Sequence, residues 1–194
     1  MTDLINSQNS PKISIIGKNS TNLASALGIS PVDLESADGA IFIVSATDGI
    51  VTADINAWRN ARELYIPSIV VINDLTVSDI DFEDMTAIAT KMLDPVSTPY
   101  LVLHGDDGAP AALIHLESLT ISDYSDGTLS TRPADPEHIA LVEEFREEYI
   151  EQVEAAGEDA FAAGLIFPAL AWVESSGIGL EQIREYLNQI PSLS

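Results

Sequence analysis

The chain has 194 residues, 46% of them apolar, and carries 31 acidic against 8 basic residues, for a formal net charge of −23. This size suffices for one hydrophobic core with a small appended subdomain, and the absence of cysteine excludes disulfides, zinc ribbons and thiol chemistry. The negative charge argues against free RNA or DNA as a partner, because Lys and Arg hold phosphate backbones, and the apolar runs are too short to span a bilayer.

The first half of the chain alternates between strand and helix patterns. Apolar, β-branched runs at 12–17, 41–44 and 69–72 are typical of strands that are buried on both faces of a parallel sheet. The patterns over 52–64 and 81–93 predict helices between and after these strands. This alternation predicts a three-layer α/β fold with a mostly parallel sheet.

The middle of the chain has a different pattern. The segments 99–104 and 111–119 flank a Gly-Asp-Asp-Gly turn, which predicts a β-hairpin. Asp135 then opens a long helix as its N-cap. Its expected apolar stripe consists of Val142, Phe145, Tyr149 and Val153. A strand near 167–172 and a closing helix return the chain to the first part of the fold.

These patterns divide the chain into three parts. Residues 1–11 form a polar lead that we expect to be disordered. The segments 12–98 and 165–194 form the α/β core, and 99–164 is an inserted α+β subdomain. Because the lead lacks the basic and apolar regions of a signal peptide, we expect a cytoplasmic protein without a membrane partner.

The turn after the first strand resembles a damaged phosphate-binding loop. Such loops have the pattern GxxxxGK[ST], in which backbone N–H groups and the lysine hold phosphates and the hydroxyl holds Mg²⁺. Here Gly17 is followed by Lys18, Asn19, Ser20 and Thr21. The stretch is three residues shorter than the pattern, and it lacks the second glycine and the lysine that should precede the helix. Lys18 therefore cannot occupy the phosphate-contacting position. We expect the Thr21 hydroxyl to cap the helix instead.

Three strings carry a resemblance to a known family: ADGAIFIVSATDG, LHGDDG and RPADPEHIALVEE. They resemble the G domain of elongation factor G with its G′ insertion, and most closely its actinobacterial elongation-factor-G-like paralogues. The resemblance covers about 12–193 and implies a P-loop-NTPase-like G domain, with the G′ insertion at 99–164. The sequence fits both a standalone domain and a fragment of a longer factor.

The other nucleotide elements of that family are also degenerate. Only ten residues, 28–37, stand where switch I, two strands and the DxxG motif are expected, and two strands with their loops need about twice that length. The NKxD motif keeps Asn73, but Asp74 replaces the lysine and Thr76 replaces the base-reading aspartate. The last motif falls on Val173 and Glu174. The degenerate nucleotide positions are Gly17, Lys18, Ser20, Thr21, Asn73, Asp74, Thr76, Val173 and Glu174.

The pattern predicts a pseudo-GTPase: a translation-factor G domain that serves as a protein-interaction module. It is not expected to be an enzyme, to bind GTP with Mg²⁺ or another cofactor, or to hold a metal. One alternative is a divergent GTPase that binds GTP or another purine nucleotide. Another is an acidic structural or regulatory domain unrelated to ribosomes.

Two surfaces are candidate contact sites for a protein partner. In the family the G′ insertion touches the ribosomal stalk protein, so the resemblance implies docking within 99–156. There Glu144, Glu147 and Glu151 lie on one helix face, which either steers a basic, ribosome-associated protein or is merely solvated.

The second surface is the first strand. Without the family's second and third strands, 12–16 becomes an edge of the sheet. Such an edge invites a homodimer, a partner strand or coverage by the N-terminal lead.

Overall fold

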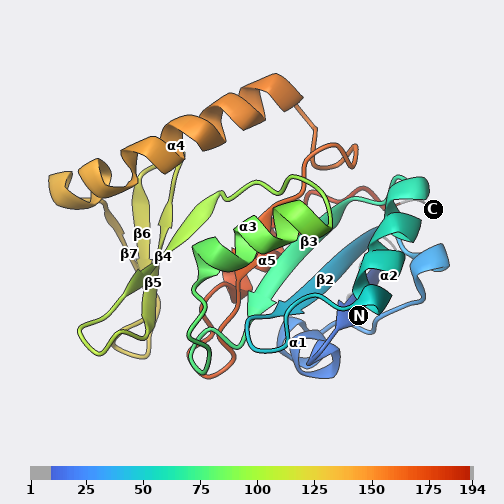
Figure 1. Cartoon of the computed structure of the whole chain (residues 1–194), viewed down its shortest axis with the longest axis horizontal. Coiled ribbons are helices and arrows are strands. Elements are labelled where there is room, and N and C mark those ends of the chain that lie inside the picture. Colours follow the sequence, from blue (N-terminus) through green and yellow to red (C-terminus); the bar gives the residue numbers. More distant parts are fainter. Residues whose placement is uncertain (1–9, 193–194) are drawn as a thin grey trace, which may run out of the picture.

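The β-branched runs form a parallel four-stranded sheet at the centre of the computed structural model, which describes residues 10–192 (Figure 1). The strands β1 (Ile13–Gly17), β2 (Gly39–Ser45), β3 (Ser68–Asn73) and β8 (Ala169–Ala171) follow one another in that order. Every residue of β2 and β3 is buried, as their uninterrupted apolar sequences require. The predicted disorder of the N-terminal lead falls almost wholly outside the described residues.

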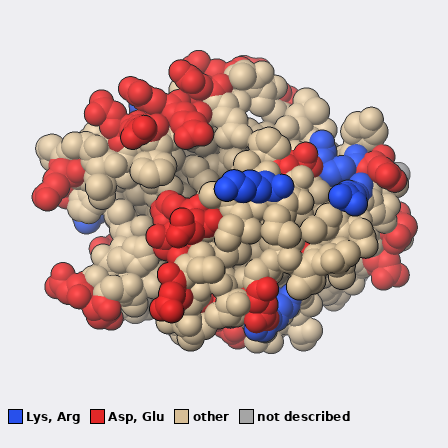
Figure 2. Space-filling model, in the orientation of Figure 1, with Lys and Arg blue, Asp and Glu red and all other residues tan. Residues whose placement is uncertain are grey.

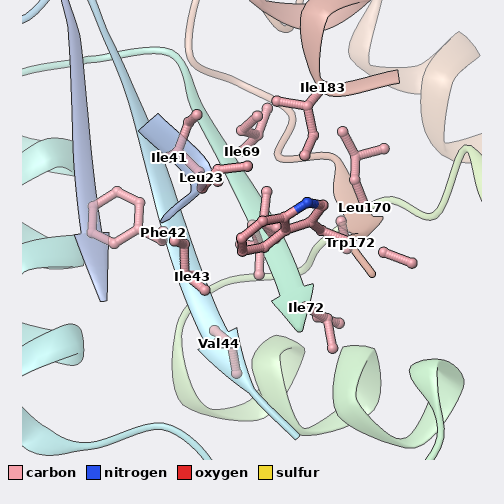
Figure 3. Close-up of a cluster of buried hydrophobic side chains, with 14 of the residues drawn as sticks. Leu23, Ile41, Phe42, Ile43, Val44, Ile69, Ile72, Leu170, Trp172 and Ile183 are labelled. Atoms are coloured by element: carbon pink, nitrogen blue, oxygen red, sulfur yellow. The ribbon is translucent and has the colours of Figure 1, made fainter. Parts of the chain in front are cut away.

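Helices surround this sheet. They are α1 (Ser20–Leu27), α2 (Thr52–Glu63), α3 (Phe82–Met92) and α5 (Leu180–Leu187), with a short 3-10 turn at Leu34–Ser36. The two helices predicted at 52–64 and 81–93 are confirmed. Figure 3 shows how Leu23 of α1 and Ile183 of α5 lie near Ile41 and Ile69 of the sheet. The sheet and helices therefore share one hydrophobic core.

The inserted subdomain is an antiparallel sheet crossed by one long helix (Figure 1). Its strands are β4 (Tyr100–His104), β5 (Pro110–His115), β6 (Thr120–Asp123) and β7 (Ser130–Pro133), and its helix is α4 (Pro136–Ala156). The hairpin is confirmed, but the single strand predicted over 111–119 is wrong. The chain turns at 116–119, where Leu119 has φ +53°, and a third strand begins.

The start of α4 follows its predicted chemistry. The Asp135 side chain accepts a hydrogen bond from the His138 backbone N–H at 3.1 Å, as an N-cap does. Val142 and Tyr149 of the predicted stripe are buried, but Phe145 is 43% exposed. The buried pair is spaced by seven residues, so the contact face of α4 is narrower than predicted.

The edge of β1 is partly covered by the chain itself. The Val32 N–H donates to the Ile13 carbonyl at 3.0 Å, so part of the segment between α1 and β2 lies beside β1. The Lys12 N–H donates to the Asp38 carboxylate at 2.8 Å. The predicted position of 12–16 at an edge is thus correct, while its pairing with another chain stays a prediction.

Candidate functional site at the carboxyl edge of the parallel sheet

The predicted nucleotide positions all follow the carboxyl ends of core strands, where open α/β sheets commonly bind ligands. Gly17 ends β1, Asn73 ends β3, and Val173 with Glu174 follows β8. Because the four strands are parallel, these ends meet at one edge of the sheet. The fold therefore brings the degenerate positions together.

The backbone conformation and the packing at position 17 require glycine. Its φ is +114°, and a Cβ at this position would lie 2.3 Å from the Ile43 carbonyl oxygen of β2. Only glycine tolerates this backbone conformation and this close approach. The residue is thus explained by packing, without any phosphate.

Lys18 is held by two carboxylates. Its Nζ lies 2.7 Å from Asp48 Oδ2 and 3.6 Å from Asp74 Oδ2. The hydrogen bond to Asp48 is the main cause that raises the Lys18 pKa, and the same bond lowers the pKa of Asp48. The lysine that follows Gly17 therefore makes its contacts with the protein's own acids.

Asp74 joins the ends of β2 and β3 through a hydroxyl network. Ser45 Oγ donates to Asp74 Oδ2 at 2.6 Å and lies 2.8 Å from Thr47 Oγ1. The backbone N–H groups of Thr47 and Asp48 also reach Ser45 Oγ, at 3.3 and 3.2 Å. Asp74 adopts φ +61°, a left-handed conformation that aspartate tolerates better than most residues. The residue in the family's lysine position thus anchors a turn.

The beginning of α1 corrects one prediction. The helix starts at Ser20, so Thr21 is its second residue and does not cap it. The N-cap is Asn19, with φ 66° and no side-chain capping bond, and its carbonyl accepts the N–H groups of Asn22 and Leu23. Because the helix already begins at Ser20, Thr21 lies inside its first turn.

A carboxylate lies beside the first turn of α1. Asn22 Nδ2 is 3.2 Å from both carboxylate oxygens of Glu174, which belongs to the loop between β8 and α5. Helix N-termini attract anions, including phosphates. Here a carboxylate of the protein itself bonds a side chain in that turn. The neighbouring Val173 is buried, and its backbone N–H bonds the Ile178 carbonyl at 3.1 Å.

Asn73 is the polar residue of this edge that the described structure leaves unexplained. It is 3% exposed, and neither its Nδ2 nor its Oδ1 has a hydrogen-bond partner among the described residues. A buried amide without partners is destabilising. Thr76, two residues beyond Asp74, is exposed.

Sequence reasoning misses two residues at this edge. They are Asp48 and Ser45, neither of which is among the predicted site residues. The signal for Asp48 is an acid three residues beyond the end of β2, the strand that neighbours β1 and Lys18. Across the described range 10–192, no group of three or more His, Asp or Glu residues is arranged to hold a metal ion. Nor does any helix of that range have the length and apolarity to cross a membrane.

Comparisons with known proteins agree with this architecture. No family model matches the chain. It is 24% identical over 176 residues to the elongation factor G-like protein of Mycobacterium tuberculosis, in strains CDC 1551 / Oshkosh and ATCC 25618 / H37Rv, covering 78% of this chain and 24% of that protein. The crystal structure of ttk003000868 from Thermus thermophilus matches with a TM-score of 0.68 and 25% identity, over 82% of this chain and 27% of that one.

The predicted fold and family resemblance are therefore confirmed. The chain is similar to elongation factor G-like translation factors and folds as such a G domain with an inserted subdomain. It spans about a quarter of the length of the relatives that it matches.

Proposed function

We propose that this elongation-factor-G-like G domain is a pseudo-GTPase, which does not bind GTP and acts as a protein-interaction module. The observation that carries the proposal is the pairing of Lys18 with Asp48 and Asp74. A triphosphate needs cations and free N–H donors. At this edge it would meet these two acids and Glu174, with Lys18 already engaged.

The residues at the positions that read guanine in the family support the same proposal. A site that reads guanine loses roughly 2–4 kcal/mol when the acceptor for the base N–H groups is absent. Thr76 stands in that position and carries no carboxylate. Asp74, which replaces the family's lysine, is occupied by Ser45 at 2.6 Å. The affinity for the phosphates and the affinity for the guanine base are thus each expected to be low, for separate reasons.

Nucleotide titration tests the proposal directly. We expect calorimetry with GTP or GDP and Mg²⁺ to give no affinity tighter than about 100 μM, which corresponds to roughly −5.5 kcal/mol. The double variant Asp48→Asn with Asp74→Asn releases Lys18 while keeping both side-chain shapes, and serves as a matched control. A wild-type dissociation constant tighter than about 100 μM would overturn the proposal.

Asn73 favours a second candidate, a divergent binder of purine nucleotides. Its two unpartnered amide atoms at the base end of the edge are suited to a ligand with both a donor and an acceptor. Adenine, hypoxanthine and xanthine nucleotides therefore belong in the same titration. Saturable binding of one of them, lost in Asn73→Leu, would support this candidate over the pseudo-GTPase.

The same substitution gives a stability prediction. Asn73→Leu is expected to raise the free energy of unfolding by about 1 kcal/mol, because it removes a buried amide without partners and keeps the number of side-chain heavy atoms and the branch at Cγ. Urea unfolding followed by circular dichroism measures the change. Ser45→Ala is the contrasting variant, because it breaks the bond to Asp74 and should destabilise. If Asn73→Leu destabilises as much as Ser45→Ala, the Asn73 amide has partners in solution.

The partner surface proposed for this module is the acidic face of α4. Glu144, Glu147 and Glu151 are exposed there, and Figure 2 shows acidic side chains gathered along the upper rim, over α4. Two apolar side chains, Leu141 at 68% and Phe145 at 43% exposure, lie on the same helix. A mixed acidic and apolar surface suits a basic protein, and a ribosome-associated one is the candidate that the family suggests.

Charge reversal tests this surface. Changing Glu144, Glu147 and Glu151 to lysine is expected to abolish salt-sensitive capture of the partner from a cell lysate, while the melting temperature stays nearly unchanged. Reversal of three exposed acids on the core, Asp33, Glu63 and Asp79, makes the same change in net charge and is the control. Equal capture by both variants would show that the α4 face is only solvated.

The edge of β1 is the second proposed contact. Lys12 directs its carbonyl to β2 and Ile13 directs its carbonyl to Val32, so by alternation the Ile15 backbone faces outward. Ile15→Pro removes that outward N–H without breaking the β1–β2 ladder. We expect a homodimer in light scattering for the wild type and a monomer for this variant. A monomeric wild type would exclude pairing through this edge.

A further inference from the structure

A cavity of about 600 Å³ lies between the core and the inserted subdomain, away from the sheet edge described above. It is bounded by α4, β5, α5 and the loop that follows α4. This volume falls in the range of small-molecule sites. Neither the nucleotide elements nor the exposed face of α4 involve this cavity.

Aromatic rings form much of its wall. Tyr100, Tyr149, Phe161 and Tyr186 line it, which includes three of the five tyrosines in the chain. Phe161 and Tyr186 meet edge to face with centroids 5.1 Å apart, and Tyr100 stacks on His115 at 4.6 Å. These contacts fix the positions of the Tyr100, Phe161 and Tyr186 rings in the wall.

The charges at the rim are all negative. The lining includes Glu117, Glu158, Asp159 and Glu185, and it contains no lysine or arginine. Within the described part of the chain, none of these four carboxylates forms an ion pair with a basic side chain. The Tyr100 hydroxyl donates to Glu185 Oε2 at 3.1 Å, which orients that carboxylate.

The other polar groups of the wall are uncharged at neutral pH. Burial lowers the pKa of the His115 imidazole and raises the pKa of the Tyr100, Tyr149 and Tyr186 hydroxyls. The cavity therefore combines neutral aromatic faces with four carboxylates and offers no positive charge of its own.

We propose that this cavity binds an organic cation, namely the alkylammonium group of an aliphatic amine. Aromatic faces attract an ammonium through their quadrupoles, and the carboxylates at the rim supply the counter-charge. The same features disfavour anions by repulsion and give neutral alcohols no electrostatic gain. Amine binding in this cavity does not depend on whether the domain binds nucleotide.

Isosteric ligands test the sign of the charge. Butylamine and 1,4-diaminobutane are titrated into the full chain beside butanol and butyrate, and the backbone amide signals of Ala160 and Ala162 are followed by NMR. We expect saturable shifts with dissociation constants below about 5 mM for the amines only. Equal responses to butanol, or no saturable response to either amine, would overturn the proposal.

Variants locate the binding. Glu117→Gln with Glu185→Gln removes two charges and keeps an acceptor for Tyr100, and it is expected to weaken amine binding at least about fivefold. Glu144→Gln with Glu147→Gln makes the same change in net charge on the outer face of α4 and should leave binding within about twofold of wild type. Equal weakening by both pairs would mean diffuse electrostatic attraction and would refute a site in the cavity.

The source of the ammonium group is decided by a second comparison. A free polyamine and a protein lysine share this chemistry, so spermidine is compared with Nα-acetyl-lysine N-methylamide. Tighter binding of the capped lysine identifies the side chain of a protein partner as the ligand, and tighter binding of spermidine identifies a free amine. Failure of both at millimolar concentration would reject the site.

Discussion

Gly179→Ala is expected to destabilise the protein by roughly 3–5 kcal/mol, the sum of backbone strain and overpacking. Gly179 is the N-cap of α5 with φ +86°, and a Cβ there would lie 1.7 Å from the Ala171 carbonyl oxygen of β8. The backbone of β8 cannot move away without losing its pairing with β3. Urea denaturation measures the loss, and failure to fold is the extreme form of the same result.

Gly177→Ala provides the matched control in the same loop. Its φ is +74°, but no atom lies within 4 Å of the added Cβ. Only the conformational strain remains, which costs about 1 kcal/mol. If the two alanine variants were equally stable, the close contact between Gly179 and β8 would be absent in solution.

Trp58→Ala is expected to cost about 3–5 kcal/mol, because it empties a large volume in the core. The indole is 1% exposed and meets Phe42 and Phe167 edge to face, at 5.0 and 5.1 Å. Its Nε1–H also donates to Asp94 at 2.7 Å, in the segment that leads into the inserted subdomain. One side chain thus connects α2, the sheet and the entrance of the insertion.

Trp58→Phe separates the two contributions. Phenylalanine keeps an aromatic ring in the cavity but cannot donate to Asp94, so a loss of about 1–2 kcal/mol is expected. Chemical denaturation of both variants measures the difference. A loss in Trp58→Phe as large as that in Trp58→Ala would assign the stabilisation to the hydrogen bond and contradict the packing explanation.

Local chemistry makes much of the fold predictable. The apolar runs of β2 and β3 are long enough to be buried on both faces, and every one of their residues is buried. Asp135 followed by proline predicts a helix start, and its carboxylate caps α4. By contrast, β7 has four exposed residues and no apolar alternation, so its sequence carries no strand signal. Its place in the sheet depends on pairing with β6.

The candidate site is predictable in position but less so in contacts. The ends of parallel strands meet wherever such a sheet forms, so Gly17, Asn73 and Glu174 are expected at one edge. The ion pair between Lys18 and Asp48 joins residues 30 positions apart. It depends on the turn that residues 18–19 adopt between β1 and α1, which no local propensity encodes. The same turn moves the start of α1 and makes the predicted Thr21 cap wrong.

The junction of the insertion with the core has a consequence for the order of folding. β3 and β8 are neighbours in the sheet but are separated by the whole insertion, so their pairing closes a long loop, which is slow. The two connecting segments pair at Ser97 and Pro168, where the Ser97 N–H donates to the Phe167 carbonyl at 2.9 Å and the Ala169 N–H donates to the Ser97 carbonyl at 2.7 Å. An insertion that folds first brings these ends together and shortens the effective loop. During synthesis of the chain, the inserted subdomain is therefore expected to fold before β8 pairs with β3, and to hold the two connecting segments close enough for that pairing.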